Sequence, residues 1–109
     1  MDTFEAIAEP TRRAVLDLLV QRERSAGELV AAFPQLTQPA VSRHLRILRE
    51  SRLADVRAEG TRRLYSLRPE VLAELDTWLE RYRPFWEERL HDLERHLDSK
   101  NSEGARRQT

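Results

Sequence analysis

The chain has 109 residues, of which 39% are hydrophobic and 35% charged. This length is typical of one domain, and the apolar content is too high for disorder but lean for a monomer of this size. The absence of cysteine excludes a disulfide framework, thiolate metal sites and a cysteine nucleophile. No apolar run approaches the ~18–20 residues of a membrane span. We therefore expect a soluble, cytoplasmic protein without membrane insertion, whose small core is supplemented by burial against a second subunit.

Charge is distributed unevenly along the chain. Basic and acidic residues number 19 each, so the formal net charge is zero. Residues 41–68 nevertheless carry eight arginines against three acids, a net +5, whereas residues 69–98 carry four arginines against nine acids, a net −5. A basic segment in a neutral chain indicates a localised anionic partner, although a solvated charged face is the alternative explanation.

The first third of the chain is predicted to be helical. Residues 2–8 are short and mildly amphipathic, and residues 11–21 repeat apolar side chains at helical spacing with Pro10 in the first turn. Ser25 and Glu28 form an S-x-x-E capping box, which predicts a helix from there through Phe33.

A further helix is predicted to run from Thr37, its N-cap, to about Glu50, with a proline tolerated in its first turn. Val41, Leu45 and Leu48 fall at i, i+4 and i+7 and should face inward. The opposite face then displays polar side chains, those of Gln38, Ser42, Arg43, Arg46, Arg49 and Glu50. Burial in a core explains the apolar positions of this helix, but it does not explain the polar ones.

The remainder of the chain predicts a hairpin and a long helix. Residues 53–67 form two short runs around Gly60, which indicates a β-hairpin with a basic tip. From Pro69 an apolar stripe at helical spacing continues to Leu97, with Pro84 predicting a kink or break. Residues 99–109 lack an apolar anchor, so we expect one domain over 1–98 and a disordered tail.

Two helices joined by a short turn and followed by a basic hairpin form the layout of a winged helix-turn-helix. A helix fits the major groove, where arginine bonds guanine and glutamine bonds adenine, while the hairpin reaches the backbone or the minor groove. We predict base or adjacent phosphate contacts from Gln38, Ser42, Arg43 and Arg46, and wing contacts from Arg62 and Arg63. For His44, a phosphate contact and packing against the neighbouring helix both remain open.

Two segments carry a resemblance to a known family. Residues 36–48, LTQPAVSRHLRIL, and the later Gly60, Arg63, Tyr65 and Leu67 resemble the signature of the ArsR/SmtB bacterial repressors. The opening residues 4–19 are similar to the same family, nearest to the branch that contains the sporulation-delay autorepressor. The resemblance implies a mainly α fold with a two-stranded β-wing: four helices, two strands and a last helix. It further implies a dimer built from the first and last helices, and repression of a promoter.

Metal-sensing members of that family place Cys-x-Cys on the first helix of the helix-turn-helix, where this chain has no ligand. Others use D-x-H and H-x-x-E on the last helix. His91 and Glu94 supply the second pair, but Trp78 and Glu80 replace the first. A zinc site needs three or four ligands, so we expect neither a metal site nor another cofactor, and leave open whether His91 and Glu94 bind a metal across a dimer.

The apolar stripe of the last helix is too extensive to leave in water. An aromatic stripe at this spacing is typical of a core or a dimer interface, and lining a small-molecule pocket is the alternative. The predicted dimer interface comprises Phe4, Ile7, Trp78, Leu79, Tyr82, Phe85, Trp86, Leu90 and Leu93.

We accordingly expect a homodimeric repressor that binds double-stranded DNA at an inverted repeat, with residues 38–50 in the major groove. The alternative is a winged-helix module that binds another protein, with vestigial DNA binding. Ser42 lacks an acid–base partner and a glycine-rich elbow, so we expect no enzyme activity. The operator, the regulated genes, the direction of regulation and any effector, whether organic ligand or sequestering protein, stay undetermined.

Overall fold

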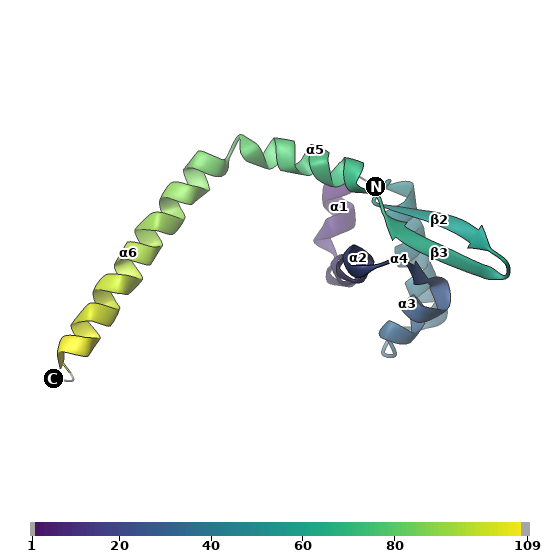
Figure 1. Ribbon diagram of the computed structural model, residues 1–109, viewed down its shortest axis with the longest axis horizontal. Helices are drawn as coiled ribbons and strands as arrows, with labels where there is room; N and C mark the ends of the chain where they lie inside the picture. Colours follow the sequence, from purple (N-terminus) through teal and green to yellow (C-terminus); the bar gives the residue numbers. More distant parts are fainter. Residues whose placement is uncertain (1, 108–109) are drawn as a thin grey trace. The chain divides into compact units, whose positions relative to one another are not determined.

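A computed structural model describes residues 2–107, with side chains described as far as residue 100, and the chain divides into two units, Met1–Ala73 and Glu74–Thr109. The elements in chain order are α1 (Thr3–Ala8), α2 (Pro10–Gln21), β1 (Arg24–Ser25), α3 (Ala26–Ala32), α4 (Gln38–Glu50), β2 (Ala54–Glu59), β3 (Arg62–Leu67), α5 (Pro69–Glu80) and α6 (Arg83–Arg107) (Figure 1). The helices up to Glu50 and the hairpin lie within one or two residues of their predicted places.

Side-chain caps fix where the helices begin. The Ser25 hydroxyl accepts the backbone N–H of Glu28 at 3.1 Å, and the Glu28 carboxylate accepts the N–H of Ser25, so the predicted capping box is present. Asp2 caps α1 and Glu9 caps α2 by accepting the N–H three residues ahead, at 2.8 and 2.9 Å. Each cap satisfies one of the N–H groups that the first turn of a helix leaves without an internal partner.

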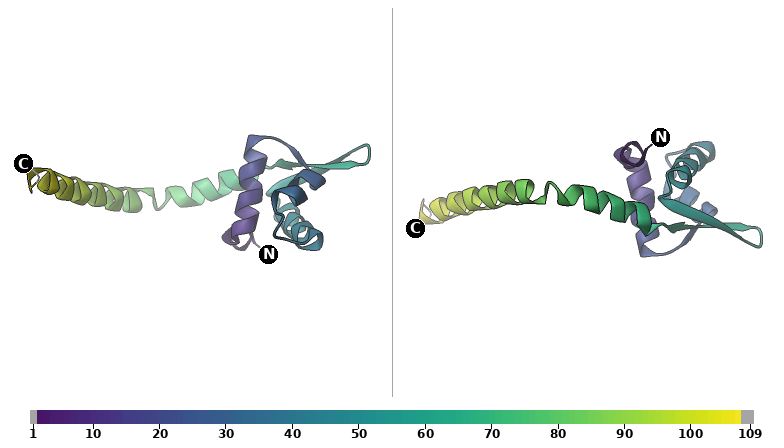
Figure 2. Two further views of the ribbon diagram at one scale, coloured as in Figure 1. Left: turned by 90° about the horizontal axis from the view of Figure 1, so that it is seen from below. Right: turned by 90° about the horizontal axis from the view of Figure 1, so that it is seen from above.

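A three-stranded antiparallel sheet of order β1-β3-β2 joins the hairpin to the helices. Ala54 pairs with Leu67 and Glu59 with Arg62, which leaves a two-residue loop whose first residue, Gly60, has a φ of 63°. Glycine at that position is typical of a type II′ hairpin turn. The hairpin projects beyond α3 and α4, and the two views of Figure 2 show the same projection.

The core of the first unit draws on every helix within it and on the sheet. Val15, Leu29, Val41, Leu48 and Leu53 are each at most 1% exposed. The remaining buried apolar residues of the same cluster are Ala6, Leu16, Leu19, Phe33, Leu45, Ala54, Tyr65 and Val71. Because the three inward positions of α4 are all buried in it, the orientation of α4 about its own axis is fixed by packing.

The second unit comprises the end of α5 and all of α6. The predicted break falls one turn earlier than Pro84, at Arg81–Tyr82, and Pro84 becomes the second residue of α6. A proline in the first turn of a helix costs no hydrogen bond, so the helix restarts around it instead of kinking. None of the described helices is long and apolar enough to cross a membrane.

The C-terminal helix is described past residue 99, where a disordered tail is expected from the sequence, and that expectation stays a prediction. α6 continues to Arg107, while residues 108 and 109 lie outside the described part of the chain. No proline interrupts residues 99–107, and a single glycine weakens a helix by only about 1 kcal/mol.

Candidate nucleic-acid interface

The candidate interface is centred on α4, whose N-terminus is fixed by Thr37. The Thr37 hydroxyl accepts the backbone N–H of Ala40 at 3.2 Å, and Pro39 occupies the second helical position. With its apolar side buried, α4 turns a continuous polar side to solvent. The predicted helix 38–50 is thus present with the predicted bounds.

Four of the predicted DNA-contacting residues, Gln38, Ser42, Arg43 and Arg46, are exposed on α4. At 3.6 residues per turn, Arg43 and Arg46 lie most directly opposite the buried side, with Ser42 and Gln38 on one flank. Among the described residues, none forms a hydrogen bond or an ion pair with these four side chains. They are therefore uncommitted within the protomer and available to an external ligand.

Arg49 extends this polar face by a further turn. It lies seven residues after Ser42, exposed in the last turn of α4, where a cation also complements the helix dipole. Glu50 is exposed beside it and is the acidic member of the face.

His44, the fifth predicted contact on α4, lies on the opposite flank. Its Nδ1 atom is 3.2 Å from Nη1 of Arg12 and 3.8 Å from the Glu9 carboxylate, and its side chain is 16% exposed. Because an arginine only donates hydrogen bonds, Nδ1 must be the acceptor and the ring proton must sit on Nε2. Of the two interpretations left open from the sequence, this geometry favours packing against the neighbouring helix.

Arg12 itself was missed by the sequence analysis. It is 7% exposed, and its guanidinium donates to the carbonyls of Ala6 at 2.6 Å and Glu5 at 3.1 Å as well as to His44. It thereby links the last turn of α1 to α4. Burial raises the pKa of the adjacent Glu9, but hydrogen bonds to its carboxylate, chiefly from the Arg12 backbone N–H, keep the pKa of Glu9 below its ordinary value.

The predicted wing residues, Arg62 and Arg63, begin strand β3 and are exposed. Arg62 lies 3.4 Å from the Glu28 carboxylate at the start of α3, whereas Arg63 makes no ion pair with any described residue. A hydrogen bond from Arg22 is the main cause that holds the pKa of Glu28 below its ordinary value.

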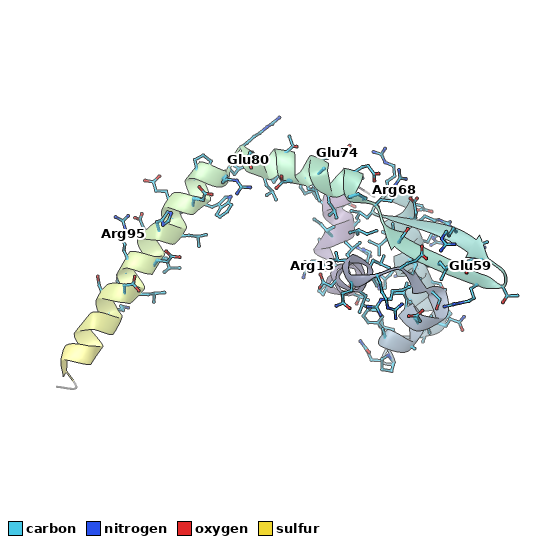
Figure 3. All side chains as sticks on the ribbon, viewed as in Figure 1. Arg13, Glu59, Arg68, Glu74, Glu80 and Arg95 are labelled. Carbon is cyan, nitrogen blue, oxygen red and sulfur yellow. The ribbon has the colours of Figure 1, made fainter. Side chains whose placement is uncertain are left out.

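Arg57 on the neighbouring strand is already neutralised. Its guanidinium bonds the Glu23 carboxylate at 2.6 and 3.2 Å and Glu59 at 3.0 Å, and the Glu23 hydrogen bonds in particular raise its pKa. Figure 3 shows Glu59 toward the outer end of the hairpin and Arg68 at its base. Among the described wing arginines, Arg63 near the tip is therefore the one that makes no ion pair.

Exposed apolar side chains concentrate in the second unit. Trp78, Leu79, Tyr82, Phe85, Trp86, Leu90 and Leu93, all predicted at a dimer interface, are 40–60% exposed, as is Leu97. In the first unit, Phe4 is 48% exposed, whereas Ile7 packs partly against the core.

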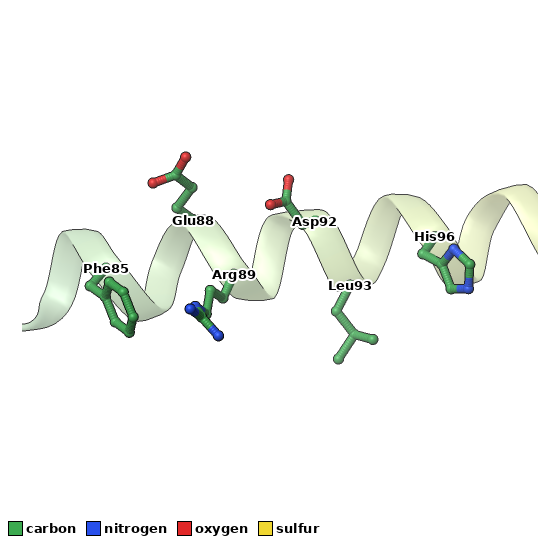
Figure 4. A pocket seen from close by; sticks show the side chains of 6 residues that line it. All are labelled: Phe85, Glu88, Arg89, Asp92, Leu93 and His96. Carbon is green, nitrogen blue, oxygen red and sulfur yellow. The ribbon is translucent and has the colours of Figure 1, made fainter.

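A hollow on α6 is lined by Phe85, Glu88, Arg89, Asp92, Leu93 and His96 (Figure 4). All six residues belong to one helix, so no second element of the described chain closes over it. This hollow therefore differs from the enclosed pockets that bind small organic molecules.

His91 lies 3.9 Å from Glu94, and no group of three His, Asp or Glu side chains that could hold a metal ion occurs among the described residues. Two ligands are fewer than a structural or catalytic zinc ion requires.

Comparisons with known proteins decide the family. A profile for bacterial regulatory proteins of the arsR family matches residues 9–56. The HTH-type transcriptional regulator Rv2034 of Mycobacterium tuberculosis is 39% identical over 100 residues, covering 92% of this chain and 90% of that protein. The chain belongs to the ArsR family. This ArsR-family chain is also 35% identical over 78 residues to the transcriptional repressor SdpR of Bacillus subtilis, covering 72% of the chain and 86% of SdpR.

Solved structures agree with this assignment. An ArsR family transcriptional regulator, RHA00566, matches with a TM-score of 0.69 at 30% identity, over 77% of this chain and 86% of that one. The homodimeric winged helix-turn-helix DNA-binding domain Mb0332 from Mycobacterium bovis matches with a TM-score of 0.58 at 32% identity, over 70% and 69%. The winged helix-turn-helix class is confirmed, with β1 as a third strand, and the ArsR-family chain is a transcriptional regulator, not an enzyme.

Proposed function

We propose that this regulator is a homodimeric repressor that binds an inverted-repeat operator, with α4 in the major groove and the β2–β3 hairpin as the wing. The observation that carries the proposal is the uncommitted polar face of α4, opposite three buried apolar residues. In this proposal, the exposed Arg43 and Arg46 donate to guanine O6 and N7 or to adjacent phosphates, and Gln38 bonds adenine.

The wing supports the same assignment through its two terminal arginines. Arg63 is open to a phosphate, and the 3.4 Å ion pair of Arg62 with Glu28 is exposed and weak enough to be exchanged for one. Contacts of this kind position the protein on the duplex and add little sequence preference.

The dimeric state is supported by the exposed apolar residues of α5 and α6 and by the homodimeric state of the relative Mb0332. A two-fold dimer presents its recognition helices to half-sites about 34–36 Å apart on one face of the DNA. An inverted repeat is the sequence that matches such symmetry.

Selection of binding sites from random duplex DNA, with and without a chelator, tests the proposal. Enrichment of a palindrome that survives chelation is the expected result. Failure to enrich any sequence at low salt would overturn it and favour the protein-binding alternative, whereas enrichment lost on chelation would restore a metal role for His91 and Glu94.

Arg43→Ala provides the residue-level test on the selected site. If Arg43 reads a base, specific affinity should fall by about 1–3 kcal/mol while affinity for random DNA falls much less. Arg95→Ala, an exposed arginine of α6 ion-paired to Asp92, is the matched control and should leave both unchanged. An unchanged ratio of specific to random affinity in Arg43→Ala would refute the base contact.

A further inference from the structure

The imidazole ring of His44 lies beside a cation and an anion that both belong to α2. Its Nδ1 atom is 3.2 Å from Nη1 of Arg12, in the first turn of α2, and 3.8 Å from Oε2 of Glu9, the N-cap of the same helix. The His44 side chain is only 16% exposed, so water has little access to the ring. One nitrogen atom of α4 therefore faces two groups of opposite charge.

Arg12 and Glu9 are the charged groups that face this ring in the part of the chain that the structure describes. Along α4, the residues one turn away from His44 are apolar, namely Ala40, Val41, Ile47 and Leu48. The other charged side chains of α1 and α2 are exposed or bonded elsewhere: Glu5 and Asp17 are exposed, Asp2 caps α1, and Arg13 bonds carbonyls of α1. Those of α3 and β2, which also pack against α4, are ion-paired elsewhere: Glu28 with Arg22 and Arg62, Asp55 with Arg68, and Arg57 with Glu59.

The protonation state of His44 decides which of its two neighbours it can bind. The neutral ring, with its proton on Nε2, accepts a hydrogen bond from Arg12 at Nδ1. A second proton turns Nδ1 into a donor that faces a guanidinium of the same charge, which has no acceptor to offer. The Glu9 carboxylate can accept that second proton's hydrogen bond. Hydrogen bonds to Glu9 outweigh its burial and keep its pKa below the ordinary value, so Glu9 is ionised wherever a histidine titrates.

From this geometry we propose that His44 is a positioning residue, whose protonation exchanges Arg12 for Glu9 as its partner and thereby weakens base reading by α4. His44 directly follows Arg43 in α4, so the exchange alters how α4 is held against α2. Base hydrogen bonds weaken steeply with distance and angle, whereas attraction to phosphate depends little on direction. The proposal rests on the proposed function and adds to it a dependence of operator binding on acidity.

Binding of the unaltered chain to the selected operator and to random duplex DNA tests the proposal, at about pH 7.5 and about pH 5.5. Operator affinity should fall about fivefold or more on acidification. Affinity for random DNA should stay constant or rise, because protonation of histidine makes the chain more cationic. General electrostatics thus has the opposite sign to the expected effect. An operator affinity that is constant, or that rises together with the affinity for random DNA, would overturn the proposal.

Replacement of His44 by an acceptor that does not titrate identifies the group responsible. H44N retains a hydrogen-bond acceptor for Arg12 and carries no proton-binding site, so its operator affinity should no longer fall on acidification, whatever its absolute value. H96N, which removes an exposed histidine of α6, is the matched control and should keep the pH response of the unaltered chain. An equal loss in H44N and the unaltered chain would refute the role of His44.

The contribution of Glu9 is tested by E9Q. The amide oxygen of glutamine can still accept the N–H that Glu9 caps, but the charge that attracts the protonated ring is gone. The loss of operator affinity should therefore move to lower pH in this variant. A loss that occurs at the same pH as in the unaltered chain would contradict the exchange of partners.

A measurement without DNA separates this switch from the proposed function. In nuclear magnetic resonance spectra of the free chain, the side-chain N–H signals of Arg12 should shift as the His44 ring titrates, and they should stay constant in H44N. Constant Arg12 signals in the unaltered chain would refute the switch even if the operator is bound. Arg12 signals that follow His44 in a chain that selects no operator would support the exchange of partners and refute DNA reading by α4.

Discussion

The guanidinium of Arg12 is the clearest case of a side chain whose role depends on burial. It donates to two carbonyls of α1 and to His44 of α4 from a position that is 7% exposed. Removing such a group leaves buried acceptors without donors, which costs more than the hydrogen bonds themselves contribute.

Arg12→Ala should therefore lower the free energy of unfolding by about 2–4 kcal/mol. Arg13→Ala is the matched control: Arg13 is exposed and bonds the carbonyls of Ile7 and Ala8 at 3.2 and 3.3 Å, so its loss should change stability by no more than about 0.5 kcal/mol. Denaturant unfolding followed by circular dichroism at fixed protein concentration measures both. Equal effects of the two substitutions would mean that the buried hydrogen bonds of Arg12 add no more stability than the exposed ones of Arg13.

At this scale the sequence predicted the exposed face of α4 well, because the helical repeat places Ser42, Arg43 and Arg46 away from the buried positions. It could not decide the role of His44, since a residue on the flank of a helix faces solvent or a neighbour depending on the packing of that neighbour. Arg12 was missed because a charged residue is almost never buried unless it is paired, and its partners are known only from the fold.

The C-terminus of α4 is capped by an arginine in a backbone conformation that favours glycine. The N–H of Leu53 bonds the carbonyl of Leu48 at 2.9 Å and the N–H of Arg52 bonds that of Arg49 at 3.0 Å, which is the Schellman arrangement. Arg52 adopts a φ of 60° to make it, although glycine is the usual residue there. A side chain in this conformation costs roughly 1–2 kcal/mol.

Arg52→Gly should accordingly stabilise the protein by about 0.5–1 kcal/mol, the relief of strain being offset in part by the greater freedom of glycine in the unfolded chain. Arg52→Ala removes the same charge without relieving the backbone and should give no gain. Thermal and denaturant unfolding of the two variants distinguish these outcomes. A stabilisation shared by both would point to charge, not to backbone conformation.

Elements with local signals were predictable, and those set by distant contacts were not. The capping box, the helical spacing and Gly60 fix α3, α4 and the hairpin from residues within one or two turns. The strand β1 has two residues and no periodicity of its own, since it exists only through its pairing with β3. The break before Pro84 was displaced by one turn because proline is compatible with the start of a helix as well as with its end.

For the molecule as a whole, the neutral net charge makes DNA affinity depend on the local basic surface. Each phosphate neutralised by a protein cation releases counterions and adds about −0.9 to the slope of log K against log salt. In the proposed dimer, Arg63→Ala removes one such contact from each protomer and should reduce the magnitude of the slope by about 2. Affinity for random DNA should fall along with affinity for the operator.

Binding measured across salt concentrations provides this slope, and Arg95→Ala again serves as the control with an unchanged value. A slope that is identical in Arg63→Ala would show that the tip of the wing does not contact phosphate.

The pairing of β1 with β3 also bears on how the chain is built during synthesis. Arg24 pairs with Tyr65 and Ser25 with Leu64 in the strand register, so the loop that this pairing closes is about forty residues long. Contacts across such a separation form only after a large loss of chain entropy, and later than the local helices and the hairpin turn. On the ribosome, the helix-turn-helix segment therefore emerges in full before the wing can be attached to it.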